Sequence, residues 1–179
     1  DSAESSPQGN ASLEGAEFTI KYYNALYDKV SDLPEEASRT WVVQTKAVKF
    51  SNGSISYISA LGETYKVSGD DFYYIDGFVT LPIGTITIQE TKAPEGYLLE
   101  GAILSDNNGN TGNVDNGVYL TQIKQASSGG VAKVVAGNFP VVKDEVKKHK
   151  VEVEKLSEDK DEVTAPLNNA VFTIKLKSE

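Results

Sequence analysis

The stretch LPIGTITIQETKAPEGYLL, residues 81–99, places an acidic residue where its own pattern calls for an apolar one. Side chains of a β-strand alternate between its two faces, so Glu90 shares a face with Ile86 and Ile88. The threonines between them lie on the other face. The alternation therefore predicts a carboxyl group that points into the apolar core, which requires a chemical reason.

The composition limits the classes of protein to which the chain can belong. Its 179 residues suffice for one domain, or for one domain and part of another. The net charge of −9 argues against nucleic acid or an acidic membrane surface as a partner, because phosphate binding needs clustered Lys and Arg. No apolar run reaches about 18 residues, so we expect no membrane insertion. The absence of cysteine removes disulfides, thiolate catalysis and cysteine-based zinc sites.

Strand patterns dominate the sequence. Several short segments are rich in Val, Ile, Thr, Tyr or Phe and are bounded by turn-forming residues. They are residues 16–23, 40–46, 55–60, 63–67, 78–81, 85–90, 118–124, 131–136 and 150–156. One short helix is predicted over 33–38, with Pro34 early in its first turn. The pattern predicts an all-β fold, an antiparallel β-sandwich with at most one short helix.

The chain also contains an internal repeat. ASLEGAEFTIK at 11–21 shares Ala, Leu, Ala, Phe, Thr, Ile and Lys with APLNNAVFTIK at 165–175. This period is too long for a solenoid and indicates serial domains of one kind. We therefore predict a first domain over 1–147. Residues 148–179 are then either the opening strands of a second repeat or a donor segment that completes a sandwich.

The acidic strand and the turn after it resemble the E-box of Cna B-type, SpaA-like domains, which occur in surface proteins and pilins of Gram-positive bacteria. The positions that fit this motif are Leu81, Pro82, Gly84, Glu90, Thr91, Ala93, Pro94, Gly96 and Tyr97. LEGAEFTIKYYN at 13–24 is similar to an early strand of the family, VVAGNFPVV at 134–142 to its closing strand and VEVEKLSED at 151–159 to its opening strand.

The resemblance implies a prealbumin-like, Ig-like β-sandwich that serves as a stalk or shaft module of an adhesin or pilus. It also implies an extracellular location at the cell wall, and an autocatalytic isopeptide bond between a Lys and an Asn, promoted by the E-box Glu. Burial keeps the Lys amine neutral and the Glu protonated, which makes the amine nucleophilic and the acid a proton donor. The reaction turns over once, so we expect neither a turnover enzyme nor a cofactor.

Under this resemblance Glu90 is the catalytic acid, and strand parity selects its partners. Lys155 shares a face with Val151 and Val153, which predicts that it points inward. Lys21 is the alternative lysine, and its parity predicts an outward side chain. Asn138 precedes Phe-Pro at the end of a predicted strand and is the expected acceptor, with a Gly-Asn turn as the alternative interpretation.

The order of these residues departs from that of the family, in which the Lys strand comes first and the Asn strand last. Here Lys155 follows Asn138, so under the resemblance we expect the first domain to lack an opening strand of its own. Three interpretations stay open: the lysine partner is missing, residues 148–177 fold back within the chain, or they complete the sandwich of a neighbouring copy head to tail. Other copies or repeats of the domain are thus the expected partners.

Two further features suggest alternatives. Asp106, Asn108 and Asn110 have the spacing of a calcium loop, but Thr111 and Gly117 stand where that loop requires Gly and Glu, so we expect no metal site. The tyrosines and the loop 104–117 suggest a second function class, an adhesin module that binds a host glycan or matrix protein.

Overall fold

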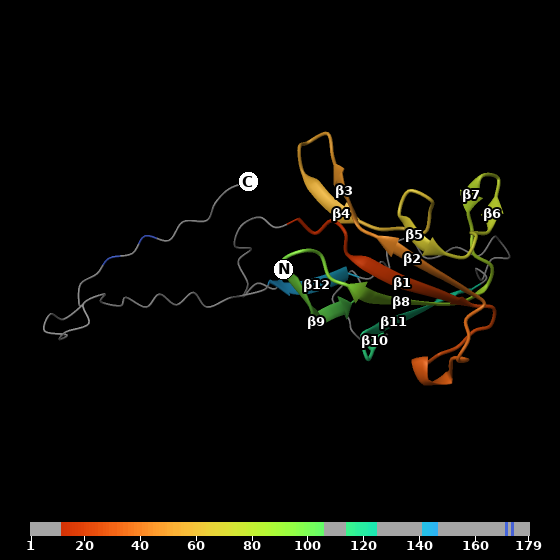
Figure 1. Ribbon diagram of the computed structural model, residues 1–179. Coiled ribbons are helices and arrows are strands. Elements are labelled where there is room, and N and C mark those ends of the chain that lie inside the picture. The colour runs from red at the N-terminus through yellow and green to blue at the C-terminus, as the bar shows by residue number, and fades with distance from the viewer. Residues whose placement is uncertain (1–11, 106–113, 125–140, 147–170, 172, 174–179) are drawn as a thin grey trace, which may run out of the picture. The chain divides into compact units, whose positions relative to one another are not determined.

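The computed structural model describes residues 12–105, 114–124, 141–146, 171 and 173. The chain divides into two units, residues 1–147 and residues 148–179. Within the second unit only Val171 and Thr173 are described, so the architecture below is that of the first unit (Figure 1). The domain organisation predicted from the sequence stays a prediction, because the roles proposed for 148–179 fall outside the described residues.

Antiparallel strands make up the first unit. They are β1 (Glu17–Tyr23), β2 (Arg39–Gln44), β3 (Lys46–Lys49), β4 (Ile55–Ile58), β5 (Lys66–Gly69), β6 (Tyr74–Ile75), β7 (Phe78–Val79), β8 (Gly84–Lys92), β9 (Tyr97–Ser105), β10 (Val114–Asp115), β11 (Val118–Ile123) and β12 (Val141–Val146). The main sheet has the order β10-β11-β8-β1-β2-β5, and β12-β9, β3-β4 and β6-β7 form two-stranded sheets. The predicted all-β class is confirmed.

The helix predicted over 33–38 is wrong. The described residues contain only a short 3₁₀ turn, η1, at Val30–Asp32. Leu33 at its end is extended, with φ −70° and ψ 141°. Proline disfavours helical backbone in the residue before it, so Pro34 ends the turn instead of opening a helix.

Most predicted strands are confirmed within a few residues, but two differences stand out. β9 was not predicted, because YLLEGAILS lacks the apolar–polar alternation by which a half-buried strand is recognised. β12, which pairs with it, was likewise not among the predicted strand segments. The strands predicted over 131–136 and 150–156 lie outside the described residues.

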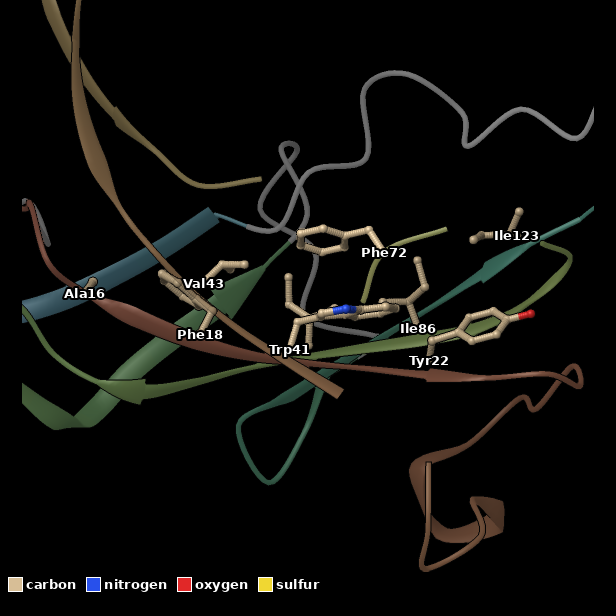
Figure 2. Close-up of a cluster of buried hydrophobic side chains, with 9 residues drawn as sticks. Ala16, Phe18, Tyr22, Trp41, Val43, Phe72, Ile86 and Ile123 are labelled. Atoms are coloured by element: carbon tan, nitrogen blue, oxygen red, sulfur yellow. The ribbon is translucent and has the colours of Figure 1, made fainter. Parts of the chain in front are cut away.

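One face of the main sheet carries the hydrophobic core (Figure 2). In the sheet register, Ile20 of β1 lies opposite Trp41 of β2 on one side and Ile88 of β8 on the other. The Trp41 side chain is fully buried and its ring stacks on Phe72, with the centroids 5.5 Å apart. The buried members of this cluster are Ala16, Phe18, Ile20, Tyr22, Trp41, Val43, Phe72, Ile86 and Ile123.

The opposite face of the sheet is partly covered by the segment between β1 and β2. Thr85 of β8 is the anchor: its hydroxyl accepts a hydrogen bond from the Tyr27 amide at 2.8 Å and donates one to the Ala25 carbonyl, also at 2.8 Å. The Gln122 side-chain amide donates to the Tyr27 carbonyl at 2.6 Å. These bonds bury Thr85 completely on a face that alternation alone would leave in solvent.

Gly84 starts β8 because no side chain fits there. A Cβ atom at this position would collide with the Tyr23 carbonyl oxygen and lie 2.7 Å from Cε2 of Tyr22. Tyr22 also donates a hydrogen bond to the Ile83 carbonyl at 3.1 Å, which fixes the entry into the strand. Gly84, the glycine of the LPIG turn, thus allows the strand that carries Glu90 to begin close against β1.

Candidate functional site

Glu90 lies on the core face of the main sheet. It is opposite Phe18 of β1, and its side chain is 5% exposed. The prediction that this carboxyl points into the core is confirmed by its burial and register, while its chemical role stays a prediction. Charged groups are seldom this deeply buried without a specific function, which makes Glu90 the centre of the candidate site.

The surroundings of Glu90 on this face are apolar and aromatic. Phe18 is its direct neighbour on β1, and Ile88 precedes it on the same face of β8. Tyr119 of β11 lies opposite Ile88, which makes it a diagonal neighbour of Glu90. Diagonal pairs remain within reach of long and aromatic side chains. Among the described residues, the strand neighbours of Glu90 on this face are therefore apolar or aromatic.

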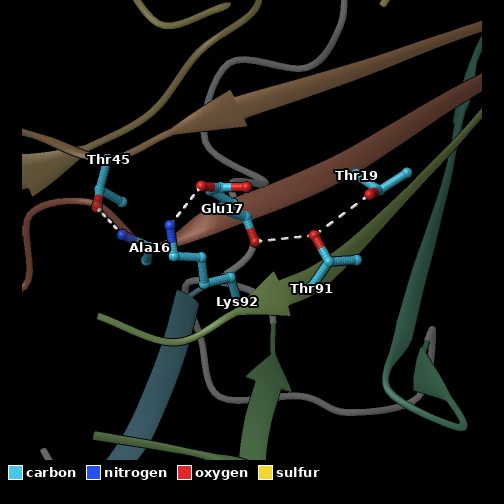
Figure 3. Close-up of polar contacts among 6 residues, drawn as sticks. All are labelled: Ala16, Glu17, Thr19, Thr45, Thr91 and Lys92. Atoms are coloured by element: carbon cyan, nitrogen blue, oxygen red, sulfur yellow. Dashed lines mark hydrogen bonds and ion pairs between the residues drawn. The ribbon is translucent and has the colours of Figure 1, made fainter. Parts of the chain in front are cut away.

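Polar contacts fasten the end of β8 to β1 beside this site (Figure 3). Lys92 forms an ion pair with Glu17 at 2.7 Å, on the exposed edge of the site. The Thr91 hydroxyl donates to the Glu17 carbonyl at 3.3 Å and accepts from the Thr19 hydroxyl at 3.3 Å. Glu90 is thus held by a strand whose next two residues are both tied to β1.

The start of β1 is held in a similar way. The Thr45 hydroxyl accepts a hydrogen bond from the Ala16 amide at 3.0 Å (Figure 3) and donates one to the Leu13 carbonyl at 2.6 Å. Thr45 follows β2 and is buried. Near Glu90, side-chain hydrogen bonds therefore add to the backbone hydrogen bonds that join β8, β1 and β2.

Lys21, the alternative lysine, lies on the other face of the sheet from Glu90. Its register partners are Thr40 and Thr87, whereas Glu90 pairs with Phe18. The predicted outward orientation of Lys21 is confirmed. In this arrangement its amine and the Glu90 carboxyl are separated by the sheet itself, which disfavours Lys21 as the lysine on which Glu90 acts.

Lys21 instead lines a cleft of about 230 Å³ between the sheet and the segment that covers it. The lining residues are Thr19, Lys21, Tyr23, Val30, Leu33, Pro34, Glu35, Thr87, Gln89 and Val118. Charged, polar and apolar groups are mixed along its walls, so the cleft does not indicate one ligand class.

The remaining predicted site residues fall outside the described part of the chain. Asn138 and Lys155 both do, and their pairing stays a prediction. The calcium-like spacing at 106–110 also lies there, and among the described residues no group of three His, Cys, Asp or Glu could hold a metal ion.

Two of the tyrosines, Tyr73 and Tyr74, lie at the β6–β7 hairpin. The Tyr74 hydroxyl donates a hydrogen bond to Glu63 at 3.0 Å. Partial desolvation raises the pKa of Tyr74, and this hydrogen bond raises it further. Arg39 lies over the Tyr73 ring, 4.9 Å from its centroid. At the hairpin itself Ile75 is 61% and Phe78 75% exposed, an apolar pair that sequence reasoning missed.

Two buried polar atoms on the core face were also missed. The Tyr119 hydroxyl and Nε1 of Trp41 are buried and have no hydrogen-bond partner within the described ranges. Alternation along 118–124 places Tyr119 on one face, but only the sheet register shows that this is the face of Glu90.

Comparison with known proteins agrees with this architecture. The family model for SpaA, described as a prealbumin-like fold domain, matches residues 5–117. This range includes β1 to β8 and the whole motif around Glu90. Comparison with curated protein sequences finds no match. Of the helical segments described, none has the length and apolar character needed to cross a membrane. On the family match and the antiparallel sandwich, the chain belongs to the SpaA prealbumin-like domain family.

Proposed function

We propose that this chain is a structural module of a Gram-positive cell-surface adhesin or pilus, and that an isopeptide bond promoted by Glu90 stabilises it. The observation that carries the proposal is the burial of Glu90 in the core of a domain of this family, at 5% exposure. A carboxylic acid in such a site favours its protonated form, because burial disfavours the charged one. A protonated acid can donate to a carbonyl oxygen, which an exposed carboxylate cannot.

The proposed reaction joins a lysine amine to an asparagine carboxamide. The neutral amine attacks the carboxamide carbon, a carbon–nitrogen bond forms, and the original carbon–nitrogen bond breaks to release ammonia. Glu90 donates its proton to the carbonyl oxygen during attack and relays a proton from the amine to the departing ammonia. Folding holds the groups together, so no external catalyst is needed. Asn138 and Lys155 are the residues we assign to this reaction.

The lysine is supplied either by the same chain or by a neighbouring copy. Lys155 follows the first domain in sequence, and Lys21 is on the wrong face of the sheet. We favour strand complementation, in which residues 148–177 of one copy complete the next sandwich head to tail. A sandwich that lacks an edge strand is prone to this kind of association.

Intact mass spectrometry of the full chain tests the chemistry. Each bond should lower the mass by ~17 Da, the mass of one ammonia. Glu90→Gln keeps the shape of the side chain but removes the acid, so it should restore the full mass. Glu17→Gln is the matched control. Glu17 is also an acid and precedes Phe18, the register partner of Glu90, but it pairs with Lys92 at the surface. This variant should keep the mass deficit of ~17 Da. A wild-type chain of full mass would refute the crosslink.

Denaturing electrophoresis then separates the two sources of lysine. A bond within one chain leaves a monomer band, whereas head-to-tail bonds leave a ladder of multimers after heating in denaturant. Mixing the wild type with Lys155→Ala should shorten that ladder, because the variant can accept a strand but cannot donate a reactive one.

A second candidate function rests on the exposed aromatic surface. Tyr74, Ile75 and Phe78 are all more than half exposed on the β6–β7 hairpin. Exposed aromatic side chains of this kind are typical of binding surfaces for glycans and proteins. A glycan array and a matrix-protein panel, each probed with the wild type and with Phe78→Ser, test an adhesive role. Equal binding by both would remove this hairpin as the binding surface.

A further inference from the structure

The hydroxyl of Tyr119 is a buried polar group for which the architecture of the sheet gives no role. Its side chain is 1% exposed, and its hydroxyl has no hydrogen-bond partner within the part of the chain that is described. A buried donor that lacks an acceptor costs stability, and Phe in its place would avoid that cost. A phenol at this position therefore calls for an acceptor that the pairing of these strands does not itself provide.

The position of Tyr119 shows what that acceptor would be near. Tyr119 lies opposite Ile88 in the β8–β11 register, and the next residue of β8 on the same face is Glu90. Diagonal neighbours across antiparallel strands are about 7–8 Å apart at the backbone, a separation that a tyrosine side chain spans. Tyr119 and Glu90 thus present a phenol and a carboxyl group to the same part of the core.

Trp41 provides an informative contrast on the same face. Its Nε1 is also buried without a partner in the described ranges. However, Trp41 lies on β2, separated from β8 by β1, and its ring is stacked on Phe72. Of the two unused donors, only Tyr119 is on a strand that adjoins β8.

We propose that the Tyr119 hydroxyl is a second hydrogen-bond donor of the Glu90 site, directed at the carbonyl oxygen of the carboxamide on which Glu90 acts. This inference rests on the proposed isopeptide chemistry. When the amine adds to the carboxamide, negative charge develops on that oxygen. A donor already in place stabilises the charge without reorganisation, as the donors of an oxyanion hole do. Tyr119 donates a hydrogen bond only; the proton that leaves with ammonia passes through Glu90.

The rate of ammonia loss in the full chain tests this role. Chains isolated in urea after a short expression pulse are refolded by dilution, and the loss of ~17 Da is followed by intact mass. Tyr119→Phe keeps the ring and removes only the hydroxyl. It should slow the loss about 100-fold, the effect of removing one oxyanion donor, and leave the shape of its pH profile unchanged because Glu90 is intact.

Tyr22→Phe is the matched control. Tyr22 is a buried tyrosine of the same core face, but its hydroxyl donates to the Ile83 carbonyl at the far end of β8. This variant should lose some thermal stability and keep the wild-type rate. In a Glu90→Gln background, where no bond forms, Tyr119→Phe should leave the melting temperature unchanged or slightly raised.

The possible outcomes separate this inference from the function on which it rests. Equal rates for the wild type and Tyr119→Phe would overturn the donor role and leave the crosslink standing. Equal slowing by Tyr119→Phe and Tyr22→Phe would overturn it as well, since the effect would then come from packing. A wild-type chain that never loses mass would overturn the crosslink and the donor role together.

Discussion

The two faces of β8 are both buried near the start of the strand, but by different means. On the core face, Ile86 packs into a cluster of aromatic and aliphatic side chains. On the other face, Thr85 and Thr87 are buried under the segment between β1 and β2. The Thr85 hydroxyl holds that segment in place, since it donates to the Ala25 carbonyl and accepts from the Tyr27 amide. One face uses apolar contact, which is not directional, and the other uses specific polar contacts.

This difference explains why Glu90 stands out. On the threonine face, the face of β8 that carries Thr85 and Thr87, the buried Thr85 hydroxyl forms its hydrogen bonds with the backbone of the segment that covers it. A carboxyl group on the apolar face breaks the rule that its own neighbours follow, and such local violations are concentrated at functional sites. The contrast therefore gives Thr85 a structural role and supports the proposal that Glu90 has a chemical one.

The largest expected effect comes from removing that chemistry. Glu90→Ala should abolish the crosslink proposed between Lys155 and Asn138. Within one chain that bond would close a loop of about 17 residues, so its loss should lower the free energy of unfolding by roughly 3 kcal/mol. In a chain of this size the melting temperature would fall by roughly 6–12 °C, measured by calorimetry. Gln89→Ala, the adjacent exposed residue on the other face, should change it very little. Equal melting temperatures for the wild type and Glu90→Ala would remove the distinction between the two faces.

A loss of comparable free energy, without any change in covalent structure, is expected from the apolar core itself. Trp41→Ala deletes a fully buried ring that stacks on Phe72, and should cost about 4 kcal/mol of unfolding free energy because a cavity remains. Urea titration followed by circular dichroism measures this cost. Trp41→Phe retains most of the packing and should lose much less. A loss under about 1 kcal/mol for Trp41→Ala would mean that this face is not the principal core.

The threonine face should respond more weakly and more locally. Thr85→Val keeps the volume but leaves the Tyr27 amide and the Ala25 carbonyl without their partner, at a cost of about 1–3 kcal/mol. Hydrogen exchange should show the Tyr27 amide losing protection while amides of β1 keep theirs. Uniform loss of protection across the sheet would contradict a local role for this contact.

The smallest effect is expected at the surface end of the strand. Lys92→Ala breaks the ion pair with Glu17, in which the lysine side chain is 64% exposed. Exposed pairs contribute about 0.2–1 kcal/mol, and salt screens them. Chemical denaturation in low and high salt measures the difference, which should shrink as salt is added. A loss as large as that of Thr85→Val would contradict the view of this pair as a weak surface contact.

Local patterns predicted the core face of β8 because strand alternation depends only on neighbours in sequence. The same patterns could not predict the burial of Thr85, which depends on a covering segment about 60 residues earlier in the chain. Pro34 was interpreted as a helix start, whereas its effect on Leu33 excludes a helix across it. Tyr119 could be placed on a face but not beside Glu90, since strand pairing is a long-range property.

The points at which the chain enters and leaves the first unit have a mechanical consequence. β1 begins at Glu17, opposite Lys92 at the end of β8, and β12 ends at Val146, opposite Tyr97 just beyond that end. The chain thus enters and leaves the sandwich at one end, and the β6–β7 hairpin lies at the other (Figure 1). A pulling force applied through these two points would act across the strands and open their hydrogen bonds one after another, a mode that resists little. Glu90 lies two residues from that same end, so a covalent bond formed there would stop the opening where it starts.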